Sequence, residues 1–357
     1  MLLIDAHLDL AWNALQWNRN LQTSVYTIRA QESKLVGVGR GLGTVALPEM
    51  RLARVAICFA TLLARSTGHT IQNLDYSSAS QAYGVAQGQL AYYKALHELH
   101  EIRLIRNRIE LDEHVTEWQQ WESNSDLSQP KVGVIISMES ADPILSPDQL
   151  LVWKKAGVRI IGPAHYGPGR YAGGTSNELG LTSIGIELLS EMNRLDMLLD
   201  LTHLSDRAFW EALDHFDGNI LASHNNCRAL VPHQRQFANE QIRAIIERQG
   251  VIGIACDNWM IQAGWIKGAK DNKPVHLIDV VDHIDHICQL AGNSEHVAIG
   301  SDLDGGFGRE QSPVDLDTIA DLQKIKDILT RRGYRDENMA AIMHGNWLRL
   351  LRKAWVK

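Results

Sequence analysis

The chain has 357 residues, of which 45% are hydrophobic, and this is enough to bury a large core. Its formal charge is −7, and no run of lysine or arginine is present, so we expect no nucleic-acid partner. The four cysteines form no CxxC pair and are too few for a disulfide scaffold. We expect reduced, mostly buried thiols.

The sequence shows no segment for membrane insertion. No stretch reaches the ~18 apolar residues of a membrane span. Leu2–Ile4 is apolar, but Asp5 follows at once, whereas a signal peptide needs a longer apolar run. We therefore expect no membrane partner and a cytoplasmic protein.

Eight short apolar runs rich in Val, Ile, Leu and Ala are typical of strands buried on both faces of a parallel sheet. In chain order they are Leu2–Leu8, Val55–Leu63, Val132–Met138, Val158–Pro163, Met197–Thr202, Ile220–Ser223, Val251–Ala255 and His296–Gly300. Two irregular segments, Thr23–Pro48 and Gly167–Thr182, are predicted as long loops after the first and fourth strands.

Amphipathic stretches between these runs predict helices. They are Ala79–His100, Asp148–Ala156, Ser183–Leu195, Asp206–His215, Asn239–Gln249, Leu277–Leu290, Leu316–Arg331 and Glu337–Lys353. The pairs Ser146-Pro147 and Ser312-Pro313 predict helix starts, with Ser as the cap and Pro in the first turn. Gly157, Gly250 and Gly292 predict left-handed helix ends.

Strands and helices that alternate in this way indicate either a (β/α)₈ barrel of the TIM type or a doubly wound sheet. No GxGxxG motif follows a strand, which weakens the doubly wound alternative as a dinucleotide-binding fold. We predict an α/β fold: a single (β/α)₈ barrel domain over residues 1–357.

Chemically active side chains recur where the predicted strands end, which is where barrels carry their active sites. Six of the eight predicted strands end in at least one such residue. These residues are His7 and Asp9 from the first strand, and then Glu139, His165, His203, His224 and Asp302. The second and seventh strands deliver none, unless Asp257 counts, and Asp304 has no clear role.

Imidazole and carboxylate groups together suit zinc and other first-row metal ions. Side chains two apart on a strand point to one face, so His7 and Asp9 can aim at one metal. One Glu can bridge two ions, and two ions ~3.5–4 Å apart can activate a water and polarise a carbonyl. Each residue alone is weak evidence, but their shared position predicts a functional metal site.

Other candidates have weaker patterns. His97 with His100, and His283 with His286, are predicted to lie on solvated helix faces, because neither pair forms HExxH. We expect the ten tryptophans to serve as packing and loop anchors, and for Trp12, Trp17 and Trp259, which follow strand ends, lining a pocket is the alternative.

Four motifs resemble the renal (membrane) dipeptidase family, in particular its bacterial members, which are amidohydrolase-like enzymes. The motifs are Asp5-Ala6-His7-Leu8-Asp9-Leu10, Leu201-Thr202-His203-Leu204-Ser205, Ala222-Ser223-His224-Asn225-Asn226 and Ile299-Gly300-Ser301-Asp302-Leu303-Asp304-Gly305. The resemblance covers nearly the whole chain in the same order. The chain departs from the family at Ser140–Pro143, where a Gly-rich segment is usual.

This resemblance implies a binuclear zinc dipeptidase, with two Zn²⁺ per chain, a metal-bridging hydroxide and a homodimer. The substrate would be a dipeptide with a free C-terminal carboxylate, and the family also accepts a D residue on the leaving side. His7 and Asp9 would hold one zinc, His203 and His224 the other, and Glu139 both.

The resemblance also implies roles in substrate binding and proton transfer. His165 would bind the substrate carbonyl and the oxyanion, and Asp302 would carry a proton from the bridging water to the leaving amine. Arg235 would grip the substrate carboxylate, with Arg228 as its rival.

Three alternatives remain open at this stage. Another amidohydrolase-type enzyme would act on N-acyl amino acids, lactones or β-lactams with the same metals. A metal-dependent sugar isomerase would use a similar site, although Arg235 and Glu139 argue against it. A scaffold that keeps zinc only for stability is disfavoured by His165 and Asp302, because neither is needed as a ligand.

Overall fold

The computed structural model describes residues 1–69, 71–124 and 126–355. Its strands are β1 (Leu3–Leu8), β2 (Val55–Leu63), β3 (Ile102–Leu104), β4 (Val132–Glu139), β5 (Val158–Gly162), β6 (Leu198–Asp200), β7 (Ile220–Leu221), β8 (Ile252–Ile254) and β9 (Val297–Ile299). The order of eight of them is β7-β6-β5-β4-β2-β1-β9-β8, and every pair is parallel. A parallel bridge between Ala222 and Ile252 joins the two ends. The predicted barrel is therefore confirmed.

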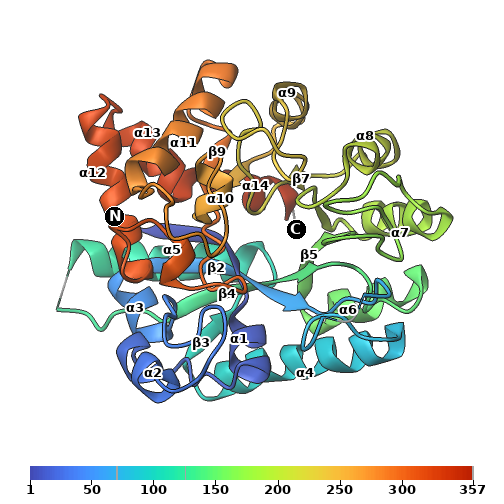
Figure 1. Cartoon of the computed structure of the whole chain (residues 1–357), viewed down its shortest axis with the longest axis horizontal. Helices are drawn as coiled ribbons and strands as arrows, with labels where there is room; N and C mark the ends of the chain where they lie inside the picture. Colours follow the sequence, from blue (N-terminus) through green and yellow to red (C-terminus); the bar gives the residue numbers. More distant parts are fainter. Residues whose placement is uncertain (70, 125, 356–357) are drawn as a thin grey trace.

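The α-helices lie around this barrel (Figure 1). They are α1 (Leu10–Gln16), α2 (Val25–Glu32), α3 (Leu47–Leu52), α4 (Ala79–Glu98), α5 (Arg108–Ser123), α6 (Leu150–Ala156), α7 (Ser183–Arg194), α8 (Asp206–His215), α9 (Asn239–Glu247), α10 (Asn258–Ile261), α11 (Leu277–Ala291), α12 (Lys324–Arg331), α13 (Asp336–Ala340) and α14 (Asn346–Ala354). Among the described residues, no helix has the length and apolar character needed to cross a membrane.

Two cores hold the barrel. An outer core lies between strands and helices, and an inner core fills the lumen with residues such as Ile4, Phe59 and Ile135. Trp347 of α14 joins the inner core and donates a hydrogen bond from Nε1 to the carbonyl oxygen of Ile299, at 2.9 Å. Figure 1 shows α14 near the centre of the view. The lumen is therefore packed, and the free space lies at the carboxyl ends of the strands.

Several local expectations need correction. The segment Thr23–Pro48 is not an irregular loop, because it contains α2 and the start of α3. The helix expected after Ser312-Pro313 begins later, at Ile319, where Thr318 and Asp321 form a capping box. Ser146-Pro147 does begin a helical turn, as expected.

The left-handed helix ends are confirmed at Gly157 and Gly292, with φ of 118° and 69°. The prediction of a left-handed helix end is wrong at Gly250, because the positive φ of 60° falls on Gln249 instead. The sequence also missed β3 and α5. All four cysteines are free, and three are buried, as expected.

Candidate metal centre and substrate cavity

The first pair of site residues comes from the end of β1. The pairing of β1 with β2 is irregular between Asp5 and Leu8, and Asp9 lies beyond the strand, as the N-cap of α1. Simple strand alternation is therefore not what brings the two together. His7 Nε2 still lies 3.9 Å from Asp9 Oδ1, and Thr61 of β2 donates a hydrogen bond to the same carboxylate oxygen.

Glu139, the last residue of β4, lies at the centre of the site. Its Oε2 is 3.6 Å from His7 Nε2. Its Oε1 is 3.1 Å from His203 Nε2 and 3.4 Å from His224 Nε2. The two carboxylate oxygens thus face two different sets of imidazoles.

His203 and His224 follow β6 and β7, and their Nε2 atoms are 3.1 Å apart. The hydroxyl of Thr175 lies 2.9 Å from Nδ1 of His203, and that of Ser223 lies 2.9 Å from Nδ1 of His224. A hydroxyl that accepts the Nδ1 proton leaves the Nε2 lone pair free, which is how metal-binding histidines are usually oriented.

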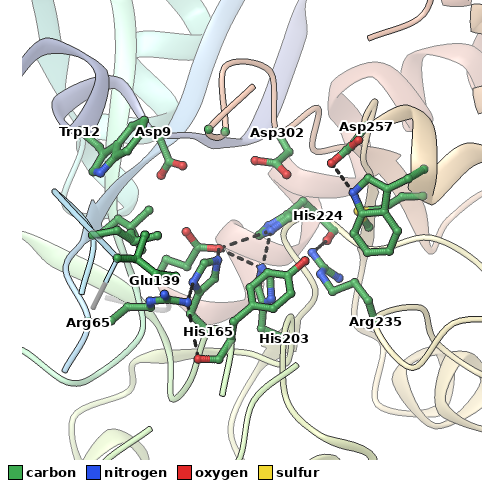
Figure 2. Close-up of a pocket in the computed structure, with 18 of the residues that line it drawn as sticks. Asp9, Trp12, Arg65, Glu139, His165, His203, His224, Arg235, Asp257 and Asp302 are labelled. Carbon is green, nitrogen blue, oxygen red and sulfur yellow. Dashed lines mark hydrogen bonds and ion pairs between the residues drawn. The ribbon is translucent and has the colours of Figure 1, made fainter. Parts of the chain in front are cut away.

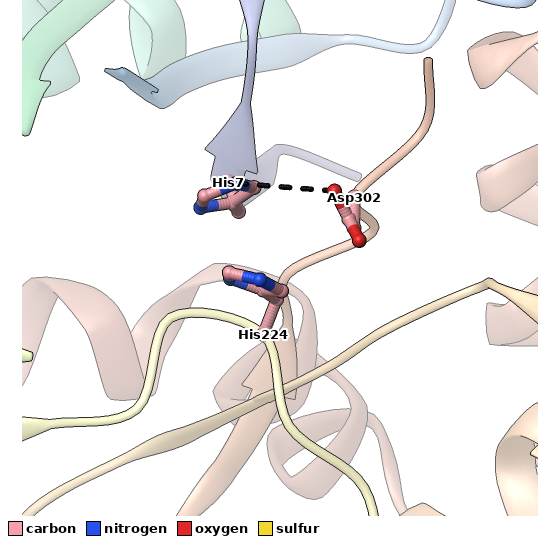
Figure 3. Close-up of side chains that lie close together, drawn as sticks. All are labelled: His7, His224 and Asp302. Carbon is pink, nitrogen blue, oxygen red and sulfur yellow. Dashed lines mark ion pairs between the residues drawn. The ribbon is translucent and has the colours of Figure 1, made fainter. Parts of the chain in front are cut away.

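These donors form overlapping groups in which the ligand atoms lie within 4.8 Å of one another. One group is His7, Asp9 and Glu139, and a second is Glu139, His203 and His224. A third combines His7, His224 and Asp302 (Figure 3), with His7 Nε2 at 3.8 Å from Asp302 Oδ1. The first two groups share only Glu139, so the arrangement fits two adjacent metal ions.

The electrostatics of the site also fit cations. Burial disfavours a charged His7, but Glu139, Asp9 and Asp302 outweigh it and raise the pKa of His7 to about 10. Nε2 of His7 is buried and has no hydrogen-bond partner among the residues that the structure describes. Because three carboxylates converge on this ring nitrogen, the site favours positive charge, which metal ions would supply.

Three of the proposed ligands have pKa values shifted toward the form that binds metal, which is the neutral imidazole or the ionised carboxylate. Burial, with the charge of Arg235, lowers the pKa of His203 well below its ordinary value, and burial with the charge of His7 does the same to His224. Burial alone would raise the pKa of Glu139, but His165 and His7 hold it well below its usual range. Burial, aided by the charges of Asp9 and Glu139, raises the pKa of Asp302.

Two of these residues have a left-handed backbone. His203 has φ of 68° and Asp302 has φ of 56°, a conformation that non-glycine residues seldom adopt. Such backbone strain costs on the order of 1–3 kcal/mol and concentrates at functional sites. It turns both side chains at the strand ends toward the cavity.

A cavity of about 280 Å³ opens over the metal-binding groups (Figure 2). Its lining includes Trp12, Arg65, Tyr166, Arg235, Asp257, Trp259 and Asp302. This size suits a small ligand. Trp12 and Trp259 line the cavity, which was the alternative to a packing role, whereas Trp17 packs against Trp12 and does not line the cavity.

The two candidate arginines lie in different surroundings. Arg235 lines the cavity, where its guanidinium donates hydrogen bonds to Asn225 and, at 2.8 Å, to the carbonyl oxygen of His224. Arg228 instead pairs with Asp206 at 2.6 Å and does not line the cavity. Only Arg235 of these two is therefore placed to meet a ligand carboxylate.

Asp304 also lies away from the cavity lining. Its carboxylate accepts hydrogen bonds from the backbone of Thr44 and Val45 and from Arg19. It fixes the segment after β1 to the segment after β9.

His165 follows β5 and faces Glu139, with 3.6 Å between Nε2 and Oε1. Its Nδ1 lies 2.9 Å from a guanidinium nitrogen of Arg65, which follows β2. Sequence reasoning missed Arg65, Tyr166 and their part in the cavity, and found no functional residue for the second strand. The signal was present: Arg65 is a charged residue directly after a nine-residue apolar strand.

One histidine expectation was wrong. His283 is buried, not solvated: its Nδ1 accepts from the backbone N–H of Cys227, and its Nε2 donates to the carbonyl oxygen of Ile261, each at 3.1 Å. His114 is also buried, with Nε2 donating to the carbonyl oxygen of Ala56 at 2.8 Å. Both are structural residues of the fold.

Comparison with known proteins shows which family this chain belongs to. The family model for membrane dipeptidase (peptidase family M19) matches residues 1–356. An uncharacterised Klebsiella pneumoniae protein of the pqqA 5′ region is 33% identical over 208 residues, which span 56% of this chain and 73% of that protein. The dipeptidase tcpJ of Claviceps purpurea is 30% identical over 212 residues, 58% of this chain and 47% of the relative.

Solved structures share the fold. A metallopeptidase of family M19, dipeptidase AC, superposes with a TM-score of 0.80 at 23% identity and covers 100% of this chain and 99% of that one. A metallopeptidase of Rhodobacter sphaeroides, solved with a phosphinate mimic of the dipeptide L-Ala-D-Ala, has a TM-score of 0.79 at 22% identity, with 99% of each chain covered. The chain belongs to the membrane dipeptidase family, peptidase family M19, and is therefore a metal-dependent hydrolase of the dipeptidase class.

Proposed function

We propose that this protein hydrolyses dipeptides that carry a free C-terminal carboxylate and that it works with two zinc ions. The observation that carries the proposal is the position of Glu139. Its Oε2 faces His7, and its Oε1 faces His203 and His224. Arg235 lines the cavity beside it, and its guanidinium pairs with no carboxylate of the described residues. His7 and Asp9 would hold one ion, His203 and His224 the other, and Glu139 both.

Bound there, the two ions would supply an ionised water as nucleophile and a Lewis acid for the substrate carbonyl. The chain's own groups perform the remaining steps. The guanidinium of Arg65 can only donate, so Nδ1 of His165 accepts and its Nε2 carries the proton into the cavity. That N–H donates to the carbonyl oxygen and stabilises the negative charge that develops there.

Asp302 moves the proton. It accepts one from the attacking water and gives it to the nitrogen of the leaving amino acid, as a general base and then a general acid. Burial raises the pKa of Asp302, which favours the protonated form that donates to the leaving nitrogen.

Arg235 selects the substrate. Its planar guanidinium suits a bidentate grip on a carboxylate. A dipeptide has that carboxylate one residue beyond the scissile bond, whereas a tripeptide or an amidated dipeptide does not. The small cavity supports the same preference for short substrates.

The direct test is the release of amino acids from L-L and L-D dipeptides, matched tripeptides and amidated dipeptides by zinc-loaded protein. We expect the free-acid dipeptides to be cleaved far faster than the tripeptides and the amidated dipeptides. No cleavage in a sample that holds two metals per chain would move the substrate to N-acyl amino acids, lactones or β-lactams.

A single domain over residues 1–357, a homodimer and a cytoplasmic location stay predictions.

A further inference from the structure

One side of the cavity carries a carboxylate that the proposed chemistry does not use. Asp257 follows β8, lines the cavity and is only 4% exposed. Gln311 Nε2 donates to both carboxylate oxygens at 2.8 and 2.9 Å, and Trp259 Nε1 donates to Oδ2 at 2.6 Å. Both donors are neutral, so they fix the orientation of the carboxylate and leave its negative charge in place.

The cation beside this carboxylate is held loosely. The ammonium of Lys267 lies 4.0 Å from Asp257 Oδ2 and 5.3 Å from the centre of the Trp259 ring. The Lys267 side chain is 60% exposed. An ion pair of this length whose cation is largely exposed contributes little, so another cation can replace Lys267 at small cost.

The surroundings leave space for such an exchange. Lys267 also lines a neighbouring groove with Trp265, Val38 and Gln311. A displaced Lys267 side chain can turn into that groove without moving the backbone. The fixed carboxylate and the aromatic face of Trp259 would remain, and together they form a cation-binding arrangement.

We propose that Asp257 and Trp259 form a subsite for a cationic side chain, of the lysine or arginine type, on the C-terminal residue of the dipeptide. Figure 2 shows Asp257 and Arg235 on the same side of the cavity, opposite Trp12 and Arg65. The residue whose carboxylate binds Arg235 is therefore the one whose side chain reaches Asp257. This inference rests on the proposed dipeptidase function, because it requires the carboxylate grip of Arg235.

The test compares zinc-loaded wild-type protein, Asp257→Asn and Lys267→Met on Ala-Lys, Ala-norleucine and Ala-Glu, each with an L or a D C-terminal residue. Norleucine matches the lysine stem without its amine. We expect wild-type kcat/KM to be about tenfold or more higher for Ala-Lys than for Ala-norleucine. Asp257→Asn should abolish this preference but change Ala-norleucine turnover less than about threefold, and Lys267→Met should raise turnover of Ala-Lys.

Two results would overturn the subsite: an equal effect of Asp257→Asn on both substrates, or a wild-type preference for Ala-Glu that Lys267→Met removes. Failure of the dipeptidase function itself is distinguishable, because none of the dipeptides would then be cleaved. Calorimetric titration of Ala-Lys and Ala-norleucine into Asp302→Asn, with and without Asp257→Asn, reads the binding preference without turnover. Equal affinities of Asp302→Asn for Ala-Lys and Ala-norleucine would refute the subsite.

Discussion

A guanidinium nitrogen of Arg65 lies 2.9 Å from Nδ1 of His165, at the end of β2 and of β5 respectively. Arg65 is itself buried and paired with Asp75 at 3.0 Å, so its position is fixed from behind. This contact sets which ring nitrogen of His165 carries the proton. The proposed role of His165 depends on that proton facing the cavity.

Arg65→Met should therefore reduce kcat by about tenfold to a hundredfold, the usual effect of losing a group that orients an active-site histidine. Arg65→Lys keeps a charged donor and should recover part of the loss. The ¹⁵N shifts of the His165 ring provide a direct readout: the wild type should show Nε2–H and an unprotonated Nδ1. The reverse tautomer in wild-type protein would disprove the orientation argument.

Asp302→Asn should keep both metals and lose ~10²–10⁴ in rate, because an amide cannot shuttle a proton. Metal analysis and steady-state kinetics on the same sample check this. Asp304→Asn is the matched control on the same turn: Asp304 anchors the segment after β1, so its loss should lower the melting temperature and spare the chemical step. Normal turnover by Asp302→Asn would remove Asp302 from the mechanism.

Arg235→Ala should raise KM for free-acid dipeptides by about tenfold to a hundredfold and leave any residual cleavage of amidated dipeptides unchanged. Arg228→Ala removes the same charge from a position that is paired with Asp206, and it should behave like the wild type in this comparison. If both kinds of substrate suffer equally in Arg235→Ala, the carboxylate is bound elsewhere.

Acid should weaken the fold through His283. Burial lowers the pKa of His283 to about 4, against an ordinary value of 6.5. Between these pH values His283 is protonated in the unfolded chain but neutral in the folded chain. The free energy of unfolding therefore keeps its full value above pH ~6.5 and falls as the pH drops toward 4. Once His283 is protonated in both states, the loss in the free energy of unfolding is about 3 kcal/mol.

Urea denaturation from pH 7 to pH 4.5 measures this effect. His283→Gln should be less stable at pH 7, because Cys227 and Ile261 lose hydrogen-bond partners, but its stability should fall less steeply with acid. The metal site is common to both proteins, so their difference isolates His283. Equal pH slopes would assign the acid sensitivity to other groups.

The sequence predicted the barrel because its strands are buried on both faces and read as continuous apolar runs. It predicted the positions of His203, His224 and Glu139 because carboxyl ends of parallel strands meet at one end of a barrel. The closeness of His7 and Asp9 was predicted for an incomplete reason, since the irregular pairing of β1 and the start of α1, not strand alternation, bring them together.

Other features lay beyond these patterns. The helix α5 buries Leu111, His114, Val115 and Trp118, a helical spacing that is hard to recognise because charged and polar residues surround it. The contact of Arg65 with His165 joins residues 100 positions apart, and local sequence gives no sign of it. His283 was placed on a solvated face because it forms no HExxH motif with His286, but its two backbone partners make burial acceptable.

The proposed role of Glu139 as a ligand shared by two metal ions is tested by the metal stoichiometry of the wild type and of Glu139→Gln, measured with activity during zinc titration of the metal-free protein. We predict two zinc ions per chain in the wild type, with activity that is complete only when both are bound. Glu139→Gln should hold neither ion tightly, because both positions lose a shared ligand. Two tightly bound ions in Glu139→Gln, or full wild-type activity without metal, would refute the shared metal site.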